Sequence, residues 1–200
     1  MLFRSLGYHF LDSGAVYRAT ALAALRAGIC ADDEAALARM AAGLDLHFGA
    51  GHIWLGGEEV SELLRQEDVG ALASRVSSFA SVREALRCLQ LDFRRVPGLV
   101  ADGRDMGTVI FPRAELKVFL TASAATRAER RHRQLVSKGI PANIDDLRQG
   151  LEMRDLRDKT RAASPLKPAE GALLLDNSAL SVEASVDVVL DAWEQRRPFV

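Results

Sequence analysis

Residues 101–112, ADGRDMGTVIFP, are the stretch that decides the fold of this 200-residue chain. They follow the apolar residues 99–100, which predict a buried strand, and they set two acids, one arginine and two glycines within six positions. Glycine lets the backbone turn sharply and approach a ligand, and the planar fork of Arg104 suits a phosphate. Asp102 and Asp105 can accept hydrogen bonds from the amine of a base or organise the waters of a metal ion. By itself, the stretch is explained more simply as a strand that ends in a solvated, charged turn.

A second stretch of the same kind lies at residues 10–18, FLDSGAVYR, where an apolar run leads into an acid, a hydroxyl and a glycine. We expect Asp12 or Ser13 to cap the helix that follows. Gly14 and Arg18 are four residues apart and therefore share one face of that helix. A hydroxyl and an arginine at the N-terminal end of a helix suit an anionic ligand. Two turns with the same chemistry favour a binding site over two unrelated turns.

Composition narrows the class of protein. Hydrophobic residues make up 48% of the chain, which is ample for a packed core, and the net charge of −1 gives no indication of nucleic acid or of an anionic membrane as a partner. The two cysteines suit neither a disulfide framework nor a CxxC site, and the four histidines lack metal-ligand spacing. We expect neither a signal peptide nor a membrane span. A cytoplasmic protein without a protein-bound metal site is the expectation.

Apolar runs and helical periodicity predict strands that alternate with helices. The expected strands span residues 8–12, 45–49, 52–55, 99–102, 116–120 and 173–176. The expected helices span residues 13–27, 33–42, 67–79, 81–95, 123–137, 144–159 and 182–196. Asp32 and Asn143 are expected to cap two of these helices, and the glycines around Ala50 are expected to form the turn of a hairpin.

Buried strands that alternate with helices are typical of an α/β protein whose parallel sheet is covered on both faces. The hairpin and helices of residues 45–95 interrupt this alternation. We therefore expect a core α/β domain over residues 1–44 and 96–200, with an inserted lobe over residues 45–95.

Residues 127–161 carry ten basic side chains against six acidic ones. Two solvated helices with salt bridges such as Asp155–Lys159 account for most of these charges. Four charged residues at positions i, i+3, i+4 and i+7 share one helical face: Arg154, Arg157, Asp158 and Arg161. On such a face, three arginines repel one another unless an anion balances them. A polyphosphate supplies that balance, whereas nucleic acid is disfavoured because aromatic residues do not interleave with the charges.

Three stretches together resemble the bacterial cytidylate kinase family: residues 11–18 (LDSGAVYR), 102–109 (DGRDMGTV) and 154–161 (RDLRDKTR). Their order and spacing are similar to those of the family over nearly the whole chain. The resemblance implies a three-layer α/β fold of the nucleoside monophosphate kinase type. In that fold a five-stranded parallel sheet carries a monophosphate-binding lobe, residues 45–95 here, and an arginine-bearing helical lid, residues 121–162 here.

The resemblance also implies an activity. Such enzymes transfer the γ-phosphoryl group of ATP to CMP or dCMP with magnesium, in pyrimidine nucleotide metabolism. We therefore expect CMP, dCMP and ATP with Mg²⁺ as ligands, no nucleic acid or membrane as a partner, and a monomer.

The resemblance assigns roles to particular residues on the acceptor side. It implies that Ser13 and Asp105 read the amine and ring edge of cytosine, with Arg83 and Arg161 beside the base. It implies that the acceptor phosphate is held by Arg18 and Arg104. Considered without the family, Ser74 and Arg83 are plain surface positions on helices.

Further residues are assigned to the sugar and to the donor side. The resemblance implies sugar contacts from Ser74, Arg154 and Asp158. It implies that lid arginines close over the ATP phosphates, among them Arg127, Arg131 and Arg157. The arginines expected to act on the transferring group are Arg104, Arg154, Arg157 and Arg161, and none of the named residues is expected to bind a metal directly.

One departure from the family is pronounced. The family begins with a strand and a glycine-rich phosphate loop, whereas this chain has no GxxxxGK[ST] pattern. Residues 1–7 resemble the tail of the family's first helix. We expect the first, central strand and its loop, on the order of two dozen residues, to be missing, and the chain to phosphorylate CMP slowly.

Two alternatives stay open on the sequence. One is a truncated remnant that binds CMP without transferring phosphate. The other is a related small-molecule kinase of the same fold, such as another nucleotide kinase or a shikimate-type kinase. The inserted lobe and the DGRDMG stretch at residues 102–107 favour CMP.

Overall fold

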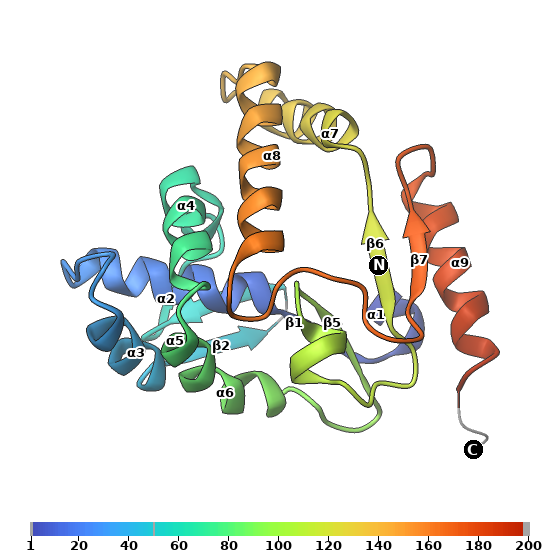
Figure 1. Ribbon diagram of the computed structural model, residues 1–200, viewed down its shortest axis with the longest axis horizontal. Coiled ribbons are helices and arrows are strands. Elements are labelled where there is room, and N and C mark those ends of the chain that lie inside the picture. The colour runs from blue at the N-terminus through green and yellow to red at the C-terminus, as the bar shows by residue number, and fades with distance from the viewer. Residues whose placement is uncertain (1, 50, 198–200) are drawn as a thin grey trace. The chain divides into compact units, whose positions relative to one another are not determined.

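The structure, a computed structural model, describes residues 2–49 and 51–197. The described residues form two compact units, one of residues 3–103 and the other of residues 104–197 with residue 2. Each unit contains one parallel pair of strands and several helices (Figure 1). Within the described residues, no helix combines the length and the apolar character needed to cross a bilayer.

The unit of residues 3–103 contains five strands and most of the short helices. Its strands are β1 (His9–Asp12), β2 (Leu46–Gly49), β3 (His52–Leu55), β4 (Glu58–Glu59) and β5 (Leu99–Asp102). Its helices are α1 (Leu2–Leu6), which begins one residue before the unit, α2 (Ser13–Arg26), α3 (Glu34–Ala42), the 3-10 turn η1 (Leu63–Arg65), α4 (Glu67–Val76), α5 (Ala80–Ala85) and α6 (Arg87–Leu91).

Strands β1 and β5 pair in parallel, with His9 opposite Leu99 and Asp12 opposite Asp102. Both strands were expected from their apolar runs, and both are confirmed. Because parallel strands end at the same edge, the two acids that close β1 and β5 lie side by side. The chain leaves that edge into α2 at Ser13, one of the two polar turns that the sequence singled out.

Helix α2 is the centre of this unit. Asp12 caps it by accepting a hydrogen bond from the amide of Ala15 at 3.0 Å, and Gly28, with φ of +63°, follows its C-terminus. Val16 and Ala19 are fully buried, because α2 packs against both α3 and α4 (Figure 1). The many alanines of α2 let these helices approach closely, and this packing holds α2 in place.

Several predicted details of this unit are wrong. The cap of α3 is Asp33, which accepts from the amide of Ala36, and not Asp32. The single helix expected over residues 81–95 is two helices, α5 and α6, with a bend at Leu86. The bend accompanies the burial of Leu86 and Gln90, and an apolar stripe cannot reveal it because both helices keep the same period.

The expected hairpin is confirmed as the antiparallel pair β2–β3, although Ala50, which was expected in its turn, lies outside the described residues. The sequence did not predict β4, which pairs with β3 through Trp54 and Glu59. Two residues are too short a run to show strand alternation.

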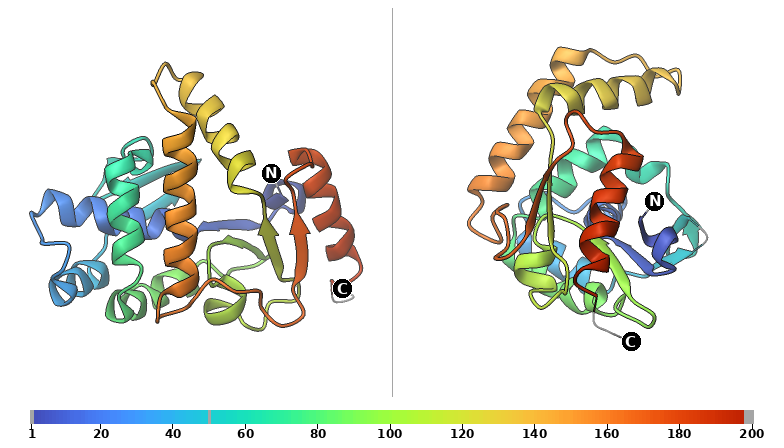
Figure 2. Two further views of the ribbon diagram at one scale, coloured as in Figure 1. Left: turned by 45° about the horizontal axis from the view of Figure 1, so that its top comes forward. Right: turned by 90° about the vertical axis from the view of Figure 1, so that its right-hand side faces the viewer.

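The unit of residues 104–197 consists of one strand pair, three long helices and a π-helical turn. They are η2 (Met106–Ile110), β6 (Val118–Thr121), α7 (Ala124–Val136), α8 (Ile144–Thr160), β7 (Leu173–Asp176) and α9 (Val182–Glu194). β6 and β7 pair in parallel, from Val118 opposite Leu173 to Thr121 opposite Asp176. Helices α7 and α8 pack against each other and meet at a short loop (Figure 2). Asn143 caps α8 as predicted.

The mixed α/β class with parallel strands is confirmed. Among the described residues, the strands form separate sheets of two, three and two strands, so the five-stranded, three-layer sheet is not seen as one piece. A missing central strand stays a prediction. So does the division into a core domain and a lobe over residues 45–95, which lie entirely within the first compact unit.

Candidate active site

Ser13 is a buried hydroxyl at the first turn of α2. Its exposed fraction is 3%, and its Oγ donates a hydrogen bond to Oε1 of Gln90 at 2.9 Å. Gln90 is itself fully buried on α6, and its Nε2 donates to the carbonyl of Leu86 at 3.3 Å. Gln90, which is 77 positions away in the sequence, therefore fixes the Ser13 hydroxyl next to the end of β1.

Arg18 lies one turn further along α2. Its guanidinium donates to the carbonyl of Leu64 at 2.9 Å and packs against Gly70 of α4. A Cβ at Gly70 would lie 2.8 Å from the Arg18 Nη1 atom, so a larger residue there would displace the guanidinium. The close packing of α2 on α4 thus holds Arg18 in place, and Gly70 is a supporting residue that sequence reasoning missed.

Arg83 of α5 also reaches α2. Its Nη1 donates to the carbonyl of Ser77 at 2.9 Å, and its Cζ lies 5.5 Å from the ring centroid of Tyr17. The expectation that Arg83 and Ser74 are surface residues is wrong, because both are at most 8% exposed. They are covered where α4 and α5 pack, and the cation–π contact compensates for part of the desolvation of Arg83. The structure thus brings Ser13, Arg83 and Gln90 to the first turns of α2.

Asp158 is the centre of the second cluster, in the unit of residues 104–197. Its Oδ2 accepts from Nε of Arg104 at 2.8 Å, and its Oδ1 lies 3.7 Å from Nη1 of Arg161. The side chains of Asp158 and Arg161 are 4% and 5% exposed, whereas Arg104 is 40% exposed. Two guanidinium groups thus converge on one buried carboxylate, an arrangement that suits an anionic ligand.

The backbone supports this cluster. The amide of Leu166 donates to the carbonyl of Asp158 at 2.8 Å, and Nε of Arg161 donates to the carbonyl of Ser164 at 2.8 Å. The prediction of one helical face needs correction, because α8 ends at Thr160 and Arg161 is an extended residue beyond it. Arg157 is exposed, while Arg154 is half-buried. The end of the helix turns Arg161 inward beside Asp158, which spacing could not show.

Asp105 is 3% exposed and lies between β5 and the turn η2. Its carbonyl accepts from the amides of Val109 and Thr108 at 2.8 and 3.2 Å, so it anchors η2. π-helical turns of this kind are frequent at functional sites. The role of Asp105 at the base stays a prediction.

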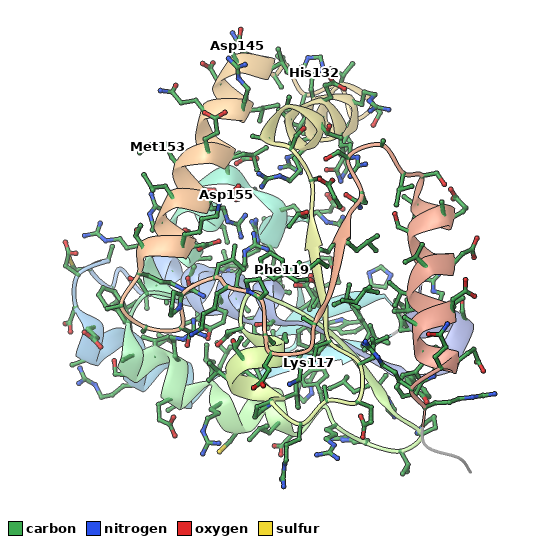
Figure 3. The ribbon with its side chains drawn as sticks, turned by 45° about the vertical axis from the view of Figure 1, so that its right-hand side comes forward. Lys117, Phe119, His132, Asp145, Met153 and Asp155 are labelled. Atoms are coloured by element: carbon green, nitrogen blue, oxygen red, sulfur yellow. The ribbon has the colours of Figure 1, made fainter. Side chains whose placement is uncertain are left out.

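Arg127 of α7 and Asp155 of α8 form a two-point ion pair, with Nη1–Oδ1 and Nη2–Oδ2 distances of 3.0 and 2.5 Å. The predicted salt bridge from Asp155 to Lys159 is replaced by this pair, since the packing of α7 on α8 brings a better-matched planar donor. Figure 3 shows Asp155 and Met153 on opposite sides of α8. Burial raises the pKa of Asp155, but hydrogen bonds from Arg127 and the charges of Arg127, Arg104 and Lys159 outweigh it, so its pKa is lowered.

The other arginines of α7 have their own contacts. Arg130 donates to the side chain and the carbonyl of Asn177 at 3.1 and 2.7 Å, which ties α7 to the end of β7. Arg131 donates to Gln134 at 2.9 Å. Arg130 is therefore a supporting residue, while the donor-side role of Arg131 and Arg127 stays a prediction. Within residues 2–49 and 51–197, no three His, Cys, Asp or Glu side chains gather in a way that could hold a metal ion.

Comparison with known proteins gives these clusters a context. The family model described as cytidylate kinase matches residues 1–195. The chain belongs to the cytidylate kinase family. The chain is 56% identical to the protein named cytidylate kinase of Cupriavidus necator over 194 residues, which cover 97% of this chain and 87% of the relative. The corresponding protein of Burkholderia cenocepacia is 58% identical over 92% of this chain and 81% of its own length, and that of Bordetella pertussis is 52% identical over 95% and 85%.

The resemblance drawn from three short stretches is therefore confirmed at the level of the cytidylate kinase family. The chain is a kinase by this membership. The sequence patterns did not identify two residues of these clusters, Gln90 and Gly70. A buried amide in a helix and a glycine in a helix interior are the signals that could have drawn attention to them.

Proposed function

We propose that this chain phosphorylates CMP and dCMP, using ATP as the donor, to give CDP and dCDP. An oxygen of the acceptor phosphate forms a bond to the γ-phosphorus of ATP, and the bond from that phosphorus to the bridging oxygen breaks, so that ADP leaves. The observation that carries this proposal is the family match over residues 1–195. The buried arginine–carboxylate cluster around Asp158 supports it, because phosphoryl transfer depends on positioning and charge neutralisation.

In the unit of residues 3–103, we assign the acceptor's contacts to groups that the fold holds firmly. Ser13 would accept a hydrogen bond from the cytosine amine, and Arg83 would lie beside the base. Arg18 would bind the acceptor phosphate with the face of its guanidinium that is not turned toward Leu64. Ser74, buried on α4, would contact the sugar. Each assignment rests on the family resemblance, and the fixed positions of these side chains support it.

In the unit of residues 104–197, we assign Asp105 and Arg161 to the base and Arg104 to the acceptor phosphate. Asp158 and Arg154 would serve the sugar. Asp158 would also hold the two guanidinium groups apart in fixed orientations, so that little reorganisation remains when an anion binds.

The donor side is assigned to the arginines of α7 and α8. Arg127, Arg131 and Arg157 would neutralise the phosphates of ATP. Arg127 would do so while anchored by Asp155. Magnesium would arrive as part of the co-substrate MgATP, since Mg²⁺ in such reactions is held largely through phosphate oxygens and water.

A coupled assay of ADP formation tests the proposal. The full chain is assayed with ATP, Mg²⁺ and, in turn, CMP, dCMP, UMP, AMP and shikimate, with the Cupriavidus necator relative as the positive control. CMP and dCMP are expected to be the best acceptors. Preference for another acceptor would favour the related-kinase alternative. Calorimetric heat from CMP without ADP formation would favour a binding remnant.

Arg18 offers a sharp variant, because Arg26 on the same helix is a matched control. Arg18→Met is expected to lower kcat/KM for CMP by about 100-fold, the size expected for a lost charge-assisted phosphate contact. Arg26, in an exposed ion pair with Glu58, is expected to give less than about a twofold change when replaced by Met. Equal effects of the two substitutions would remove Arg18 from the phosphate site.

We further propose that the protein works in the cytoplasm as a monomer. Both cysteines, Cys30 and Cys88, are free and exposed, a state that a reducing compartment maintains. Light scattering on the purified chain tests the monomer, and a mass corresponding to a dimer would overturn it.

A further inference from the structure

Gln90 is a buried polar residue to which no role in the proposed reaction has been assigned. It is 0% exposed, and burying a side-chain amide is costly unless its polar atoms are hydrogen-bonded. Both ends of the amide are bonded, one to the Leu86 carbonyl and the other to the Ser13 hydroxyl.

The contact with Leu86 decides which way the amide faces. A backbone carbonyl has no proton and can only accept, so the NH₂ end of Gln90 must point to Leu86. The carbonyl end, Oε1, therefore faces Ser13 at 2.9 Å. Since Oε1 can only accept, the single proton of the Ser13 hydroxyl is committed to this bond, and toward a ligand Ser13 offers only lone pairs.

This commitment has a chemical consequence at the base. Cytosine presents an amino group, a donor, at its C4 position, whereas uracil presents a carbonyl, an acceptor. A hydroxyl that can only accept forms a hydrogen bond with the amino group of cytosine. Against the C4 carbonyl of uracil it forms none, because two oxygen lone pairs then face each other. We propose that Gln90 is a positioning residue that makes Ser13 an obligate hydrogen-bond acceptor and thereby selects cytosine over uracil nucleotides. The inference rests on the proposed function, in which Ser13 contacts the base.

The surroundings keep the arrangement rigid. The backbone amide of Gln90 also donates to the Leu86 carbonyl, at 3.1 Å, so main chain and side chain converge on one acceptor. Seven residues before Gln90, Arg83 lies over Tyr17, one turn along α2 from Ser13. The first contact fixes Gln90 relative to Leu86, and the second joins α5 to the first turns of α2, so Oε1 stays aimed at the Ser13 hydroxyl.

Gln90→Met tests the proposal, because methionine has a similar volume but offers no comparable acceptor. The readout is the ratio of kcat/KM for CMP to that for UMP, measured on the full chain together with the Kd of each nucleotide. The ratio is expected to fall about tenfold, mainly through a lower KM for UMP, because the freed hydroxyl can rotate and donate to the uracil carbonyl. Gln90→Glu loses the amide donor to Leu86 but keeps an acceptor toward Ser13, and it is expected to keep the ratio within about threefold.

Thr20→Val is the matched control. Thr20 is also fully buried on α2, and its hydroxyl donates to the Val16 carbonyl at 3.1 Å, away from Ser13. This substitution removes a buried hydrogen bond of ordinary strength and is expected to lower stability without changing the ratio. A change in the ratio equal to that of Gln90→Met would show a general packing effect and overturn the proposal.

A second measurement avoids Gln90 variants altogether, in case Gln90→Met does not fold. Binding of CMP, UMP and a nucleotide with only hydrogen at C4 is compared between the parent chain and Ser13→Ala. An acceptor-only Ser13 predicts that UMP gains relative to the C4–H nucleotide when the hydroxyl is removed. No gain, or a loss, would overturn the proposal.

The outcomes separate this inference from the proposed function. If CMP is phosphorylated and Ser13→Ala changes the ratio but Gln90→Met does not, only the role of Gln90 fails. If Ser13→Ala leaves the ratio unchanged, the base contact of Ser13 fails, and the role of Gln90 with it. If CMP is neither bound nor phosphorylated, both proposals are overturned. In the Ser13→Ala background, Gln90→Met is expected to have no further effect on the ratio.

Discussion

Replacing Asp158 by asparagine removes the charge on which two arginines converge. Arg104 is 40% exposed, so water can take over its solvation, and its bond to Asp158 counts for at most about 1 kcal/mol. Arg161 is 5% exposed, and removing one member of a buried ion pair typically costs about 3–5 kcal/mol. The 3.7 Å separation from Asp158 and the bond from Arg161 to the Ser164 carbonyl, which remains, place the cost at the low end of that range. We expect Asp158→Asn to lower the free energy of unfolding by about 3 kcal/mol.

Urea unfolding followed by tryptophan fluorescence measures this cost, because each compact unit has one tryptophan. Trp54 belongs to the unit of residues 3–103 and Trp193 to the unit of residues 104–197. In a Trp54→Phe background, Trp193 reports the unit that contains Asp158. With a slope of about 2 kcal/mol per molar urea, the midpoint is expected to fall by about 1.5 M.

Asp145→Asn is the control on the same helix. Asp145 is 78% exposed and lies 3.3 Å from Arg148, so its loss is expected to cost less than about 1 kcal/mol. If Asp158→Asn shifts the midpoint no more than Asp145→Asn, the reasoning is refuted, because Asp158 would then not compensate a buried guanidinium.

Two further predictions concern the other ion pair and the other unit. Folding lowers the pKa of Asp155 from 3.8, so its contribution to stability is present above that value and is lost as the pH falls through the lower folded pKa. The urea midpoint of Asp155→Asn is therefore expected to fall less steeply than that of the parent as the pH is lowered below about 4. Midpoints of the two proteins that fall in parallel would contradict this. Arg83→Met is expected to destabilise the unit of residues 3–103 by about 2 kcal/mol, read from Trp54 in a Trp193→Phe background, because the bond to Ser77 and the contact with Tyr17 are both lost. Arg87→Met, which breaks only an exposed pair with Glu84, is its control, and equal losses would refute the expectation.

The sequence by itself determined the alternation of strands and helices, the strands β1, β5 and β7, and the cap of α8 at Asn143. These features depend on residues within about one helical turn of each other, where periodicity and capping act. The family could also be recognised from the sequence, because three stretches of unusual composition keep the family's order and spacing.

Only the tertiary structure decided which side chains meet. Ser13 and Gln90 are 77 residues apart, Arg104 and Asp158 are 54 apart, and Arg127 and Asp155 are 28 apart. Local pattern assigned Asp155 to Lys159 on its own helix and placed Arg83 at the surface. Packing overrode both, because a helix–helix contact brings in partners and buries faces that short-range spacing cannot register.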